Sequence, residues 1–406
     1  MVMLRSSSAA HPGAARWDEA HNDDFPDGRA SLRVCFPFLA QAHQTPHALP
    51  IAMELAAAYP DIEVTIAYLT DAHLDLIRQY AAFYPNSSVR YRRLHLPALA
   101  RADLGLRGLQ LFRRLAVLPF NTAFFDGFDA IVTPELTSLL LKRLGVRRPK
   151  FIWTLHGAGD RAAGFKKSMA GFDFVLMAGE KLERRFLELG LLRPGAYATG
   201  VYAKFDLVPM LRARQDRFFD NRRPTVLYNP HFDPALSSWP KVGFAVLDWF
   251  AANPAYNLIF APHVRLFDPP TPGRYRRFKR YAGLPNMKID LGSSASIDMT
   301  YTMAADVYLG DVSSQIAEFL TQPRPCVFLN PRHKAWETNE NFRAWSLGEV
   351  ATGVRDLATV LPRAIRRHPA MVEMQEAYVR ETFGVPFEPS AKRGAAAIAG
   401  YLKTAG

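Results

Sequence analysis

Residues 306–331, DVYLGDVSSQIAEFLTQPRPCVFLNP, indicate the fold more clearly than any other part of the chain. The apolar residues 307–309 predict a short buried strand, and residues 315–320 carry the apolar stripe of a helix. Residues 326–329 then predict a second strand. A strand, a turn, a helix and another strand in this order are typical of a parallel α/β sheet.

The start of this predicted helix carries small hydroxyl side chains. Ser313 and Ser314 follow Asp311, which ends the strand with Gly310, and Gln315 opens the helix. Backbone N–H groups and the positive end of the helix dipole converge at such a point, which favours an anion such as phosphate. Glu318, about one turn further on, is expected to face the same ligand. An alternative interpretation, that Ser313 is only an N-cap, stays open from these residues alone.

Short β-rich segments alternate with helical patterns through most of the sequence. The predicted strands cover 32–39, 62–69, 88–96, 128–133, 150–156, 172–178, 196–201, 223–230 and 256–263. The predicted helices cover 49–58, 72–84, 241–251 and 274–281. This alternation favours the α/β class, with parallel sheets covered by helices on both faces.

The arginine-rich segment 211–223 separates two such series and is interpreted as a hinge. We expect two doubly wound, Rossmann-like domains that face a central cleft. The expected divisions are a disordered segment at 1–29, an N-terminal Rossmann-like domain at 30–210, a C-terminal Rossmann-like domain at 222–353 and C-terminal helices at 354–406. The last helix, over 392–402, is expected to dock back on the N-terminal domain.

Composition sets broad limits on the function. The 406 residues suit two domains, and 49% hydrophobic with 22% charged residues is typical of a soluble globular protein. The net charge of +12 favours acidic partners such as phosphorylated ligands. Cys35 and Cys326 each lie in an apolar segment, which predicts buried reduced thiols and a reducing cytosol. No apolar run reaches the length of a membrane span.

Two histidines stand where predicted strands end. His156, followed by Gly157, comes after the strand at 150–155, where a general base with a pKa near neutrality is useful. The glycine lets a substrate approach the backbone closely. His263 follows another strand, and Arg265 beside it can grip a phosphate with two hydrogen bonds. The alternative for such a histidine is a side chain that only caps a loop.

A third polar cluster follows the strand at 223–230. It contains Asn229 and His231, with Ser237 and Ser238 just before a predicted helix, and forms another candidate anion site.

Other features are assigned to structure rather than to chemistry. His43 and His47 have the i,i+4 spacing of some metal sites, but no third ligand accompanies them, so no metal is expected. The basic and aromatic run at 274–281 is interpreted as a solvated helix face rather than a nucleic-acid surface. The amphipathic segment 106–118 fits an anionic membrane surface or a cover for the sheet, and both interpretations stay open.

These motifs together resemble the CDP-glycerol glycerophosphotransferase family, the teichoic-acid polymerase-like group of GT-B enzymes. His156-Gly157 is similar to the family's His-Gly-Thr motif, and Lys166 and Lys167 stand near its following lysine. His263 matches the histidine of its His-Pro motif. Residues 311–314, Asp-Val-Ser-Ser, resemble its Asp-Tyr-Ser-Ser motif, and the resemblance covers residues 150–331.

The resemblance implies a transferase that moves a glycerophosphate or related polyol-phosphate group from a CDP-activated donor to an acceptor hydroxyl. It implies that His156 is the base and that His263, Arg265, Ser313 and Ser314 hold the donor diphosphate. The acceptor would be a polymer or a lipid-linked molecule in cell-surface polymer biosynthesis. No cofactor, metal or nucleic-acid partner is implied. A cytoplasmic location is expected, peripheral on the inner face of an anionic membrane.

Similar clefts serve other chemistry, and three alternatives are kept. The first is an NDP-sugar glycosyltransferase for capsule or O-antigen polysaccharide. The second is an enzyme like the UDP-sugar 2-epimerases. The third is a nucleotide- or polymer-binding scaffold without catalysis.

Overall fold

The structure is a computed structural model that describes residues 32–39, 41–96, 115–158, 166–213, 217–268, 272–386 and 389–405. The predicted disordered segment 1–29 lies outside the described residues, as does all of the amphipathic segment 106–118 except residues 115–118.

The N-terminal body contains one parallel sheet of seven strands, in the order β3-β2-β1-β4-β5-β6-β7. Its strands are β1 (Leu32–Phe38), β2 (Ile62–Tyr68), β3 (Arg90–Arg93), β4 (Ala130–Thr133), β5 (Lys150–Thr154), β6 (Phe174–Leu176) and β7 (Tyr197–Ala198). The strands β1, β4 and β5 are almost continuously buried, as expected for a sheet covered on both faces.

The C-terminal body contains a second parallel sheet of six strands, in the order β10-β9-β8-β11-β12-β13. Its strands are β8 (Thr225–Asn229), β9 (Asn257–Phe260), β10 (Met287–Ile289), β11 (Val307–Gly310), β12 (Cys326–Leu329) and β13 (Glu349–Ala351). Residues 306–331 thus supply the adjacent strands β11 and β12. These two strands pair in register, from Tyr308 with Cys326 to Gly310 with Phe328.

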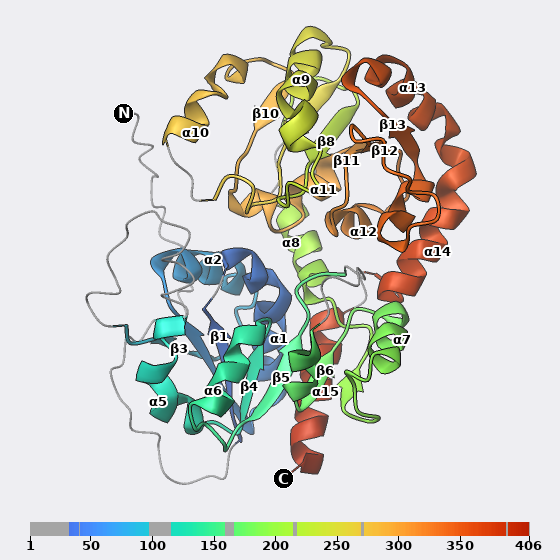
Figure 1. The fold of residues 1–406 in the computed structure, drawn as a ribbon. Coiled ribbons are helices and arrows are strands. Elements are labelled where there is room, and N and C mark those ends of the chain that lie inside the picture. The colour runs from blue at the N-terminus through green and yellow to red at the C-terminus, as the bar shows by residue number, and fades with distance from the viewer. Residues whose placement is uncertain are drawn as a thin grey trace.

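Both sheets have the same doubly wound connectivity. In each sheet the first strand of the chain segment lies inside the sheet, so the strand order reverses between β1 and β4 and again between β8 and β11. Ligands of open parallel sheets bind beside the carboxyl ends of strands at such switch points. The two bodies are stacked in Figure 1, joined near α8 and again where α14 passes toward α15. The predicted α/β class with two doubly wound sheets is confirmed.

Helices cover the faces of both sheets (Figure 1). Those of the N-terminal body and the connection are α1 (Thr45–Ala58), α2 (Asp71–Ala81), α5 (Thr122–Asp126), α6 (Leu140–Arg143), α7 (Glu180–Glu188) and α8 (Val208–Arg212). Those that follow are α9 (Trp239–Ala252), α10 (Pro272–Arg276), α11 (Thr300–Ala304), α12 (Gln315–Phe319), α13 (Leu357–Arg367), α14 (Val372–Phe383) and α15 (Ser390–Ala405).

Two boundaries differ from the sequence prediction in a way that matters. The strand predicted at 307–309 extends one residue further, because Gly310 pairs with both Phe328 and Asn229. The predicted helix 274–281 is not continuous: α10 ends at Arg276, and a 3₁₀ turn forms at Lys279–Tyr281. This break lets both Phe278 and Tyr281 bury their rings in the C-terminal core.

The C-terminal helix α15 packs on the N-terminal sheet. Its buried face, from Ala391 to Leu402, belongs to the same core cluster as α1 and the inner residues of β1 and β2. Tyr401 stacks on Phe174 of β6 with ring centroids 4.6 Å apart. Arg393 donates from Nη2 to the carbonyl of Gly200 at 2.8 Å. The last described helix therefore lies on the body that contains β1 to β7 (Figure 1).

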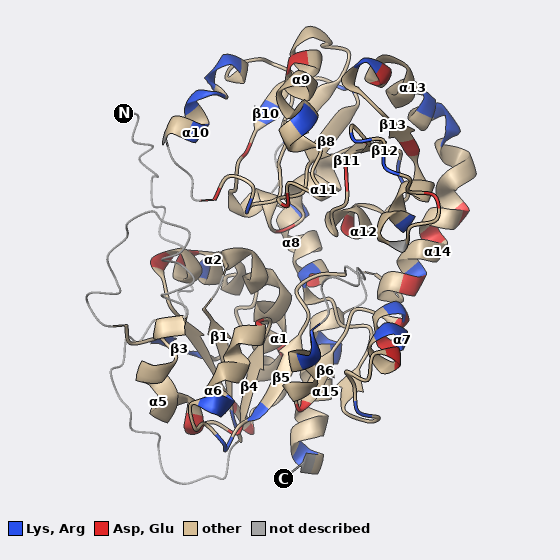
Figure 2. Cartoon of the chain, viewed as in Figure 1, with Lys and Arg blue, Asp and Glu red and all other residues tan. Residues whose placement is uncertain are grey.

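The cysteines are buried as the sequence predicted, and the basic residues are distributed over the surface helices. Cys35 and Cys326 are free and buried, as predicted. Lysines and arginines are spread over helices of both bodies, including α7, α10 and α13 (Figure 2). Arg280 in the basic run pairs with Asp248 at 2.8 Å. Within the described residues, no helix combines the length and apolar character needed to cross a bilayer.

Candidate functional site

A cavity of about 1040 Å³ lies between the two bodies. Its walls are the loops that follow β1, β4 and β5 on one side and β8, β9 and β11 on the other, so both switch points open into it. The alternation of strands and helices in the sequence predicted a cleft of this kind, because parallel strands present their carboxyl ends at a single edge of the sheet.

Five histidines line this cavity: His43, His47 and His156 from the N-terminal body, and His231 and His263 from the C-terminal body. The ring centroid of His43 lies 6.5 Å from that of His156 and 5.8 Å from that of His263. The centroid of His231 lies 5.8 Å from that of His263. The structure therefore brings together the two histidines that the motifs singled out, and adds His43 between them.

The backbone fixes the tautomer of His156. Its Nδ1 lies 2.7 Å from the carbonyl oxygen of Pro134. A carbonyl oxygen only accepts, so Nδ1 carries the proton and Nε2 of the neutral ring is unprotonated. Burial lowers the pKa of His156 below its ordinary value, although the bond to Pro134 opposes that shift. His156 is thus held as a neutral imidazole whose Nε2 can take a proton.

His231 and His263 are held in the opposite way. Nδ1 of His231 accepts from the N–H of Asp233 at 3.0 Å, and Nδ1 of His263 accepts from the N–H of Arg265 at 3.2 Å. In each neutral ring the proton therefore sits on Nε2, which becomes a hydrogen-bond donor. His231 and His263 on the C-terminal wall therefore present donors, whereas His156 on the N-terminal wall presents an unprotonated nitrogen.

His43 is surrounded by groups that oppose its protonation. Burial lowers its pKa well below the ordinary value, and His263, His156, Lys204 and Arg265 lower it further. This concentration of positive or protonatable groups makes the cavity attractive to an anion, which would relieve their mutual repulsion.

Arg265 is held over an aromatic ring at the mouth of the cavity. Its guanidinium lies 4.0 Å from the ring centroid of Phe232, and that ring lies 4.6 Å from His263. The stacking restricts an otherwise flexible side chain, so less entropy is lost when it binds a phosphate.

The serine block divides between the cavity and the core. Ser314 lines the cavity, as does Gln315. Ser313 is buried, and its Oγ accepts from the N–H of Gln315 at 3.3 Å. A Cβ added to Gly157 would lie 3.9 Å from Oγ of Ser314. The His-Gly and Ser-Ser motifs of the two bodies therefore meet across the cleft.

Asp311 does not line the cavity and acts as a buried structural anchor. Its carboxylate accepts from the N–H of His231 at 2.9 Å and from the N–H and Oγ of Ser238 at 2.7 and 2.9 Å. These bonds tie the end of β11 to the loop after β8. Asp311 and Ser238 thereby position His231 rather than meeting a ligand themselves.

Two more predicted ligand residues also lie behind the wall. Asn229 is buried and donates from Nδ2 to the carbonyl of Ala261 at 2.6 Å, which holds the end of β9 near His263. Ser237 is buried and accepts from the N–H of Trp239 at 3.2 Å.

The two lysines after the His-Gly motif separate as well. Lys166 lines the cavity, whereas Lys167 is exposed at the start of a 3₁₀ turn, Lys167–Gly171.

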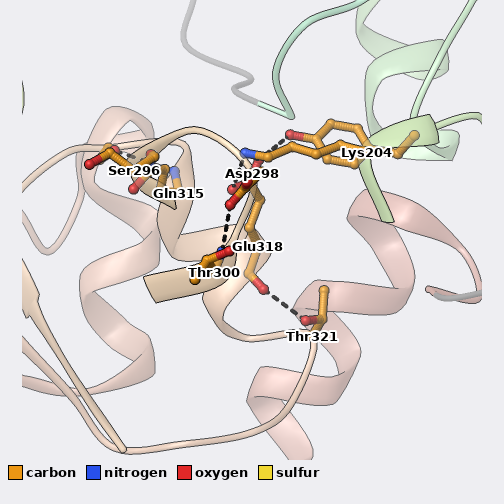
Figure 3. Close-up of polar contacts among 9 residues, drawn as sticks. Lys204, Ser296, Asp298, Thr300, Gln315, Glu318 and Thr321 are labelled. Carbon is orange, nitrogen blue, oxygen red and sulfur yellow. Dashed lines mark hydrogen bonds and ion pairs between the residues drawn. The ribbon is translucent and has the colours of Figure 1, made fainter. Parts of the chain in front are cut away.

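Glu318 lines the cavity but is engaged across the domain boundary. Its carboxylate lies 2.8 and 2.9 Å from Nζ of Lys204, and it accepts from the hydroxyl of Tyr202 at 2.6 Å. Both charged side chains are only 4% exposed. Lys204 reaches from the N-terminal body to Glu318 of α12, beside Asp298 (Figure 3). Glu318 therefore joins the two bodies and also lines the cavity in which a ligand is expected.

Sequence reasoning missed several wall residues. His43, Gln44 and His47 follow the carboxyl end of β1 and line the cavity, and so do Tyr202 and Lys204. The first three carried the same signal as His156, a strand end followed by polar side chains. The i,i+4 spacing of His43 and His47 directed attention to metals instead. Within the described residues, no three histidine, cysteine or acidic side chains are arranged to hold a metal ion.

By sequence, no protein family and no curated protein matches this chain. Its shape is similar to several solved structures. The wall teichoic acid polymerase TagF has a TM-score of 0.63 at 11% identity, over 93% of this chain and 90% of that chain. UDP-GlcNAc 2-epimerase from Neisseria meningitidis bound to UDP-GlcNAc has a TM-score of 0.59 at 11% identity, over 91% and 100%.

A glycosyltransferase from Rickettsia africae has a TM-score of 0.50 at 13% identity, over 93% of this chain and 100% of that chain. At these identities the likeness concerns the fold. Two doubly wound sheets facing a cleft, shared over nearly the whole chain with these proteins, give this protein the GT-B fold.

Proposed function

We propose that this protein is a transferase that moves a glycerophosphate-type group from a CDP-activated donor to an acceptor hydroxyl during cell-surface polymer synthesis. The observation that carries the proposal is the polarity of the cleft. The two histidines of its C-terminal wall present hydrogen-bond donors, and the unprotonated Nε2 of His156 belongs to its N-terminal wall. A transfer of this kind needs an anion site opposite a base.

The C-terminal wall supports the assignment of the donor. His231, His263, Arg265 and Ser314 all line it and all can donate to phosphate oxygens. A TagF variant soaked with CDPG has the same fold, with a TM-score of 0.61. Together these points favour a nucleotide diphosphate on this wall, with CDP as the nucleotide that we propose.

The proposed reaction is an in-line displacement at phosphorus. Nε2 of His156 takes the proton from the acceptor hydroxyl, and the oxygen attacks the phosphorus that bears the glycerol. A new P–O bond forms while the P–O bond to CMP breaks, and CMP leaves with the electron pair. Arg265 and the Nε2–H groups of His231 and His263 stabilise the charge on the leaving phosphate. The proton remains on His156 until product release.

A glycosyl-transferring or epimerising enzyme with a UDP-sugar is the second candidate. The observation that favours it is the similar fold of the 2-epimerase bound to UDP-GlcNAc. The same donor wall would hold either diphosphate, so the nucleotide decides between the two candidates.

The test is turnover of CDP-glycerol by the full chain, with release of CMP as the readout. We expect CMP release that requires an added hydroxyl acceptor. Turnover of UDP-sugars without turnover of CDP-glycerol would establish the second candidate instead.

A cytoplasmic location at the inner membrane surface belongs to the same proposal. The net charge of +12 supports it. Sedimentation with phosphatidylglycerol vesicles at low salt tests it, and absence of binding there contradicts it.

A further inference from the structure

The N-terminal wall of the cavity contains a second group of polar side chains. Gln44 and His47 lie at the start of α1, a helix of 14 residues whose first turn follows the end of β1. Ser296 faces the same cavity from the C-terminal body, in the 3₁₀ turn Ser294–Ser296 before α11. None of these residues has a part in the transfer step described above.

Each of the three carries a buried polar atom that lacks a partner. Among the residues that the structure describes, Oε1 of Gln44, Nδ1 of His47 and Oγ of Ser296 make no hydrogen bond. The side chains are 8%, 4% and 7% exposed. A buried polar atom without a partner gives up its hydrogen bond to water on folding, so three in the wall of one cavity need an explanation. A ligand that supplies the partners provides one.

The chemistry of these atoms selects the ligand. An amide oxygen such as Oε1 of Gln44 can only accept a hydrogen bond. The carboxylate of Glu135 on the same wall also only accepts, and it receives bonds from the N–H of Leu39 and from Thr137. A phosphate, which only accepts at neutral pH, would meet acceptors here. Hydroxyl groups donate and accept, so a neutral polyhydroxylated group fits this wall.

We propose that Gln44, His47 and Ser296 bind a neutral, hydroxyl-rich group, a polyol or a sugar, beside His156. Resting on the proposed function, this group is the hydroxyl-bearing end of the acceptor. The anionic donor and the neutral acceptor then occupy different parts of one cleft.

The orphan atoms sit on torsions that can turn toward a ligand. The last torsion of glutamine is broad, and the serine side chain has three staggered positions, so both oxygens have other orientations to adopt when a ligand is bound. Because Ser296 belongs to the opposite body from Gln44, the bound group contacts both domains.

Saturation-transfer NMR on the full chain, with glycerol and methyl glucoside as probes and without nucleotide, tests the proposal. We expect transfer from the wild-type protein to at least one probe. Gln44→Met and Ser296→Ala should each weaken binding about fivefold, the effect of one lost hydrogen bond. Gln44→Met preserves size and removes a buried unpaired oxygen, so its melting temperature should equal or exceed that of the wild type.

Thr45→Val is the matched control. Oγ1 of Thr45 is also buried without a partner among the described residues, but Thr45 does not line the cavity. This variant should bind the probes as the wild type does. No transfer to either probe, equal binding by Gln44→Met, or equal weakening by Thr45→Val overturns the proposal. Because no nucleotide is present, polyol binding can succeed while CDP-glycerol turnover fails, and the reverse, so the two proposals fail separately.

Discussion

Three histidines at the cleft contact the backbone through the same ring nitrogen, Nδ1, but in opposite hydrogen-bonding roles. His156 gives its Nδ1 proton to a carbonyl, whereas His231 and His263 accept at Nδ1 from backbone N–H groups. These contacts involve backbone partners alone, in the loops after β4, β8 and β9. The division between base and donors is therefore built into the backbone, and it supports the proposed roles of the two walls.

His156→Ala should lower kcat by about 10²–10⁴-fold, because it removes the group that takes the acceptor proton. Binding of the nucleotide should change little, since His156 lies on the opposite wall. Steady-state kinetics with CDP-glycerol measures the first effect and calorimetric titration the second. His95→Ala is the control, because His95 is exposed and away from the cavity. Wild-type kcat in His156→Ala would remove this residue from the mechanism.

The acid limb of kcat/KM should reflect the lowered pKa of His156. Burial shifts that pKa below its ordinary value of 6.5. A base works only when neutral, so activity should persist below pH 6.5 and fall as pH drops through the shifted pKa. A pH profile of kcat/KM, which reports the free enzyme, gives the position of the limb. A limb above 6.5 contradicts this assignment.

At the scale of elements, the docking of α15 involves a hydrogen bond to the carboxyl group of Asp206. Asp206 accepts from the N–H of Ala391 at 3.0 Å, near the start of α15. Burial raises the pKa of Asp206 to about 6, and nearby Glu54 adds to the shift. The folded protein therefore holds this proton more tightly than the unfolded chain does, where the ordinary value is 3.8.

That shift makes the docking of α15 sensitive to pH. The stability linked to the proton is full below about pH 4 and is lost as the pH rises to about 6. Asp206→Asn cannot lose a proton and keeps an oxygen for the N–H of Ala391. As the pH rises from about 4 to about 6, the melting temperature of this variant, measured by circular dichroism, should increase relative to that of the wild type. Parallel curves for the two proteins would show that Asp206 has no such role.

Elements with strong local signals could be predicted from the sequence. Residues 326–329 form β12 as predicted, because a short, continuously apolar run such as Cys-Val-Phe-Leu is typical of a buried strand. The strands β10 and β13 were missed, since each has three residues and depends on pairing with a neighbour. The start of α1 was placed four residues late, because Thr45-Pro46 opens the helix before its apolar run begins.

The candidate site could be predicted only where a strand end marked it. His156 and His263 reach the cavity as expected. Asp311 and Ser238 could not be distinguished from ligand-binding residues, because only the folded chain shows that they bond to each other. Lys204 and Glu318 lie 114 positions apart, and no local pattern announces their contact.

At the scale of the whole molecule, the Lys204–Glu318 pair links the two bodies through their cores. Lys204→Met leaves the carboxylate of Glu318 buried without its counter-ion and should cost about 3–5 kcal/mol in the free energy of unfolding. Lys204→Met combined with Glu318→Gln removes both charges and keeps an acceptor for Tyr202, so most of the stability should return. Urea denaturation measures both variants.

An exposed pair provides the comparison for this prediction. Arg280 and Asp248 are each more than half exposed, at 56% and 54%, so Arg280→Met should cost less than about 1 kcal/mol. If Lys204→Met and Arg280→Met lower the free energy of unfolding equally, the buried interdomain pair contributes no more to stability than an exposed pair.

The central claim is that the cleft between the two bodies binds a CDP-activated donor on its C-terminal wall. Calorimetric titration of the full chain with CDP-glycerol and, separately, with UDP-GlcNAc tests it most directly, with Arg265→Ala as the cleft variant and Arg366→Ala of α13 as the surface control. We predict that CDP-glycerol binds both the wild type and the control variant. Arg265→Ala should weaken the binding of CDP-glycerol at least about tenfold, as expected for a lost charged hydrogen bond. UDP-GlcNAc should bind the wild type more weakly than CDP-glycerol does. Tight binding of UDP-GlcNAc with none of CDP-glycerol, or binding of CDP-glycerol that Arg265→Ala leaves unchanged, would contradict it.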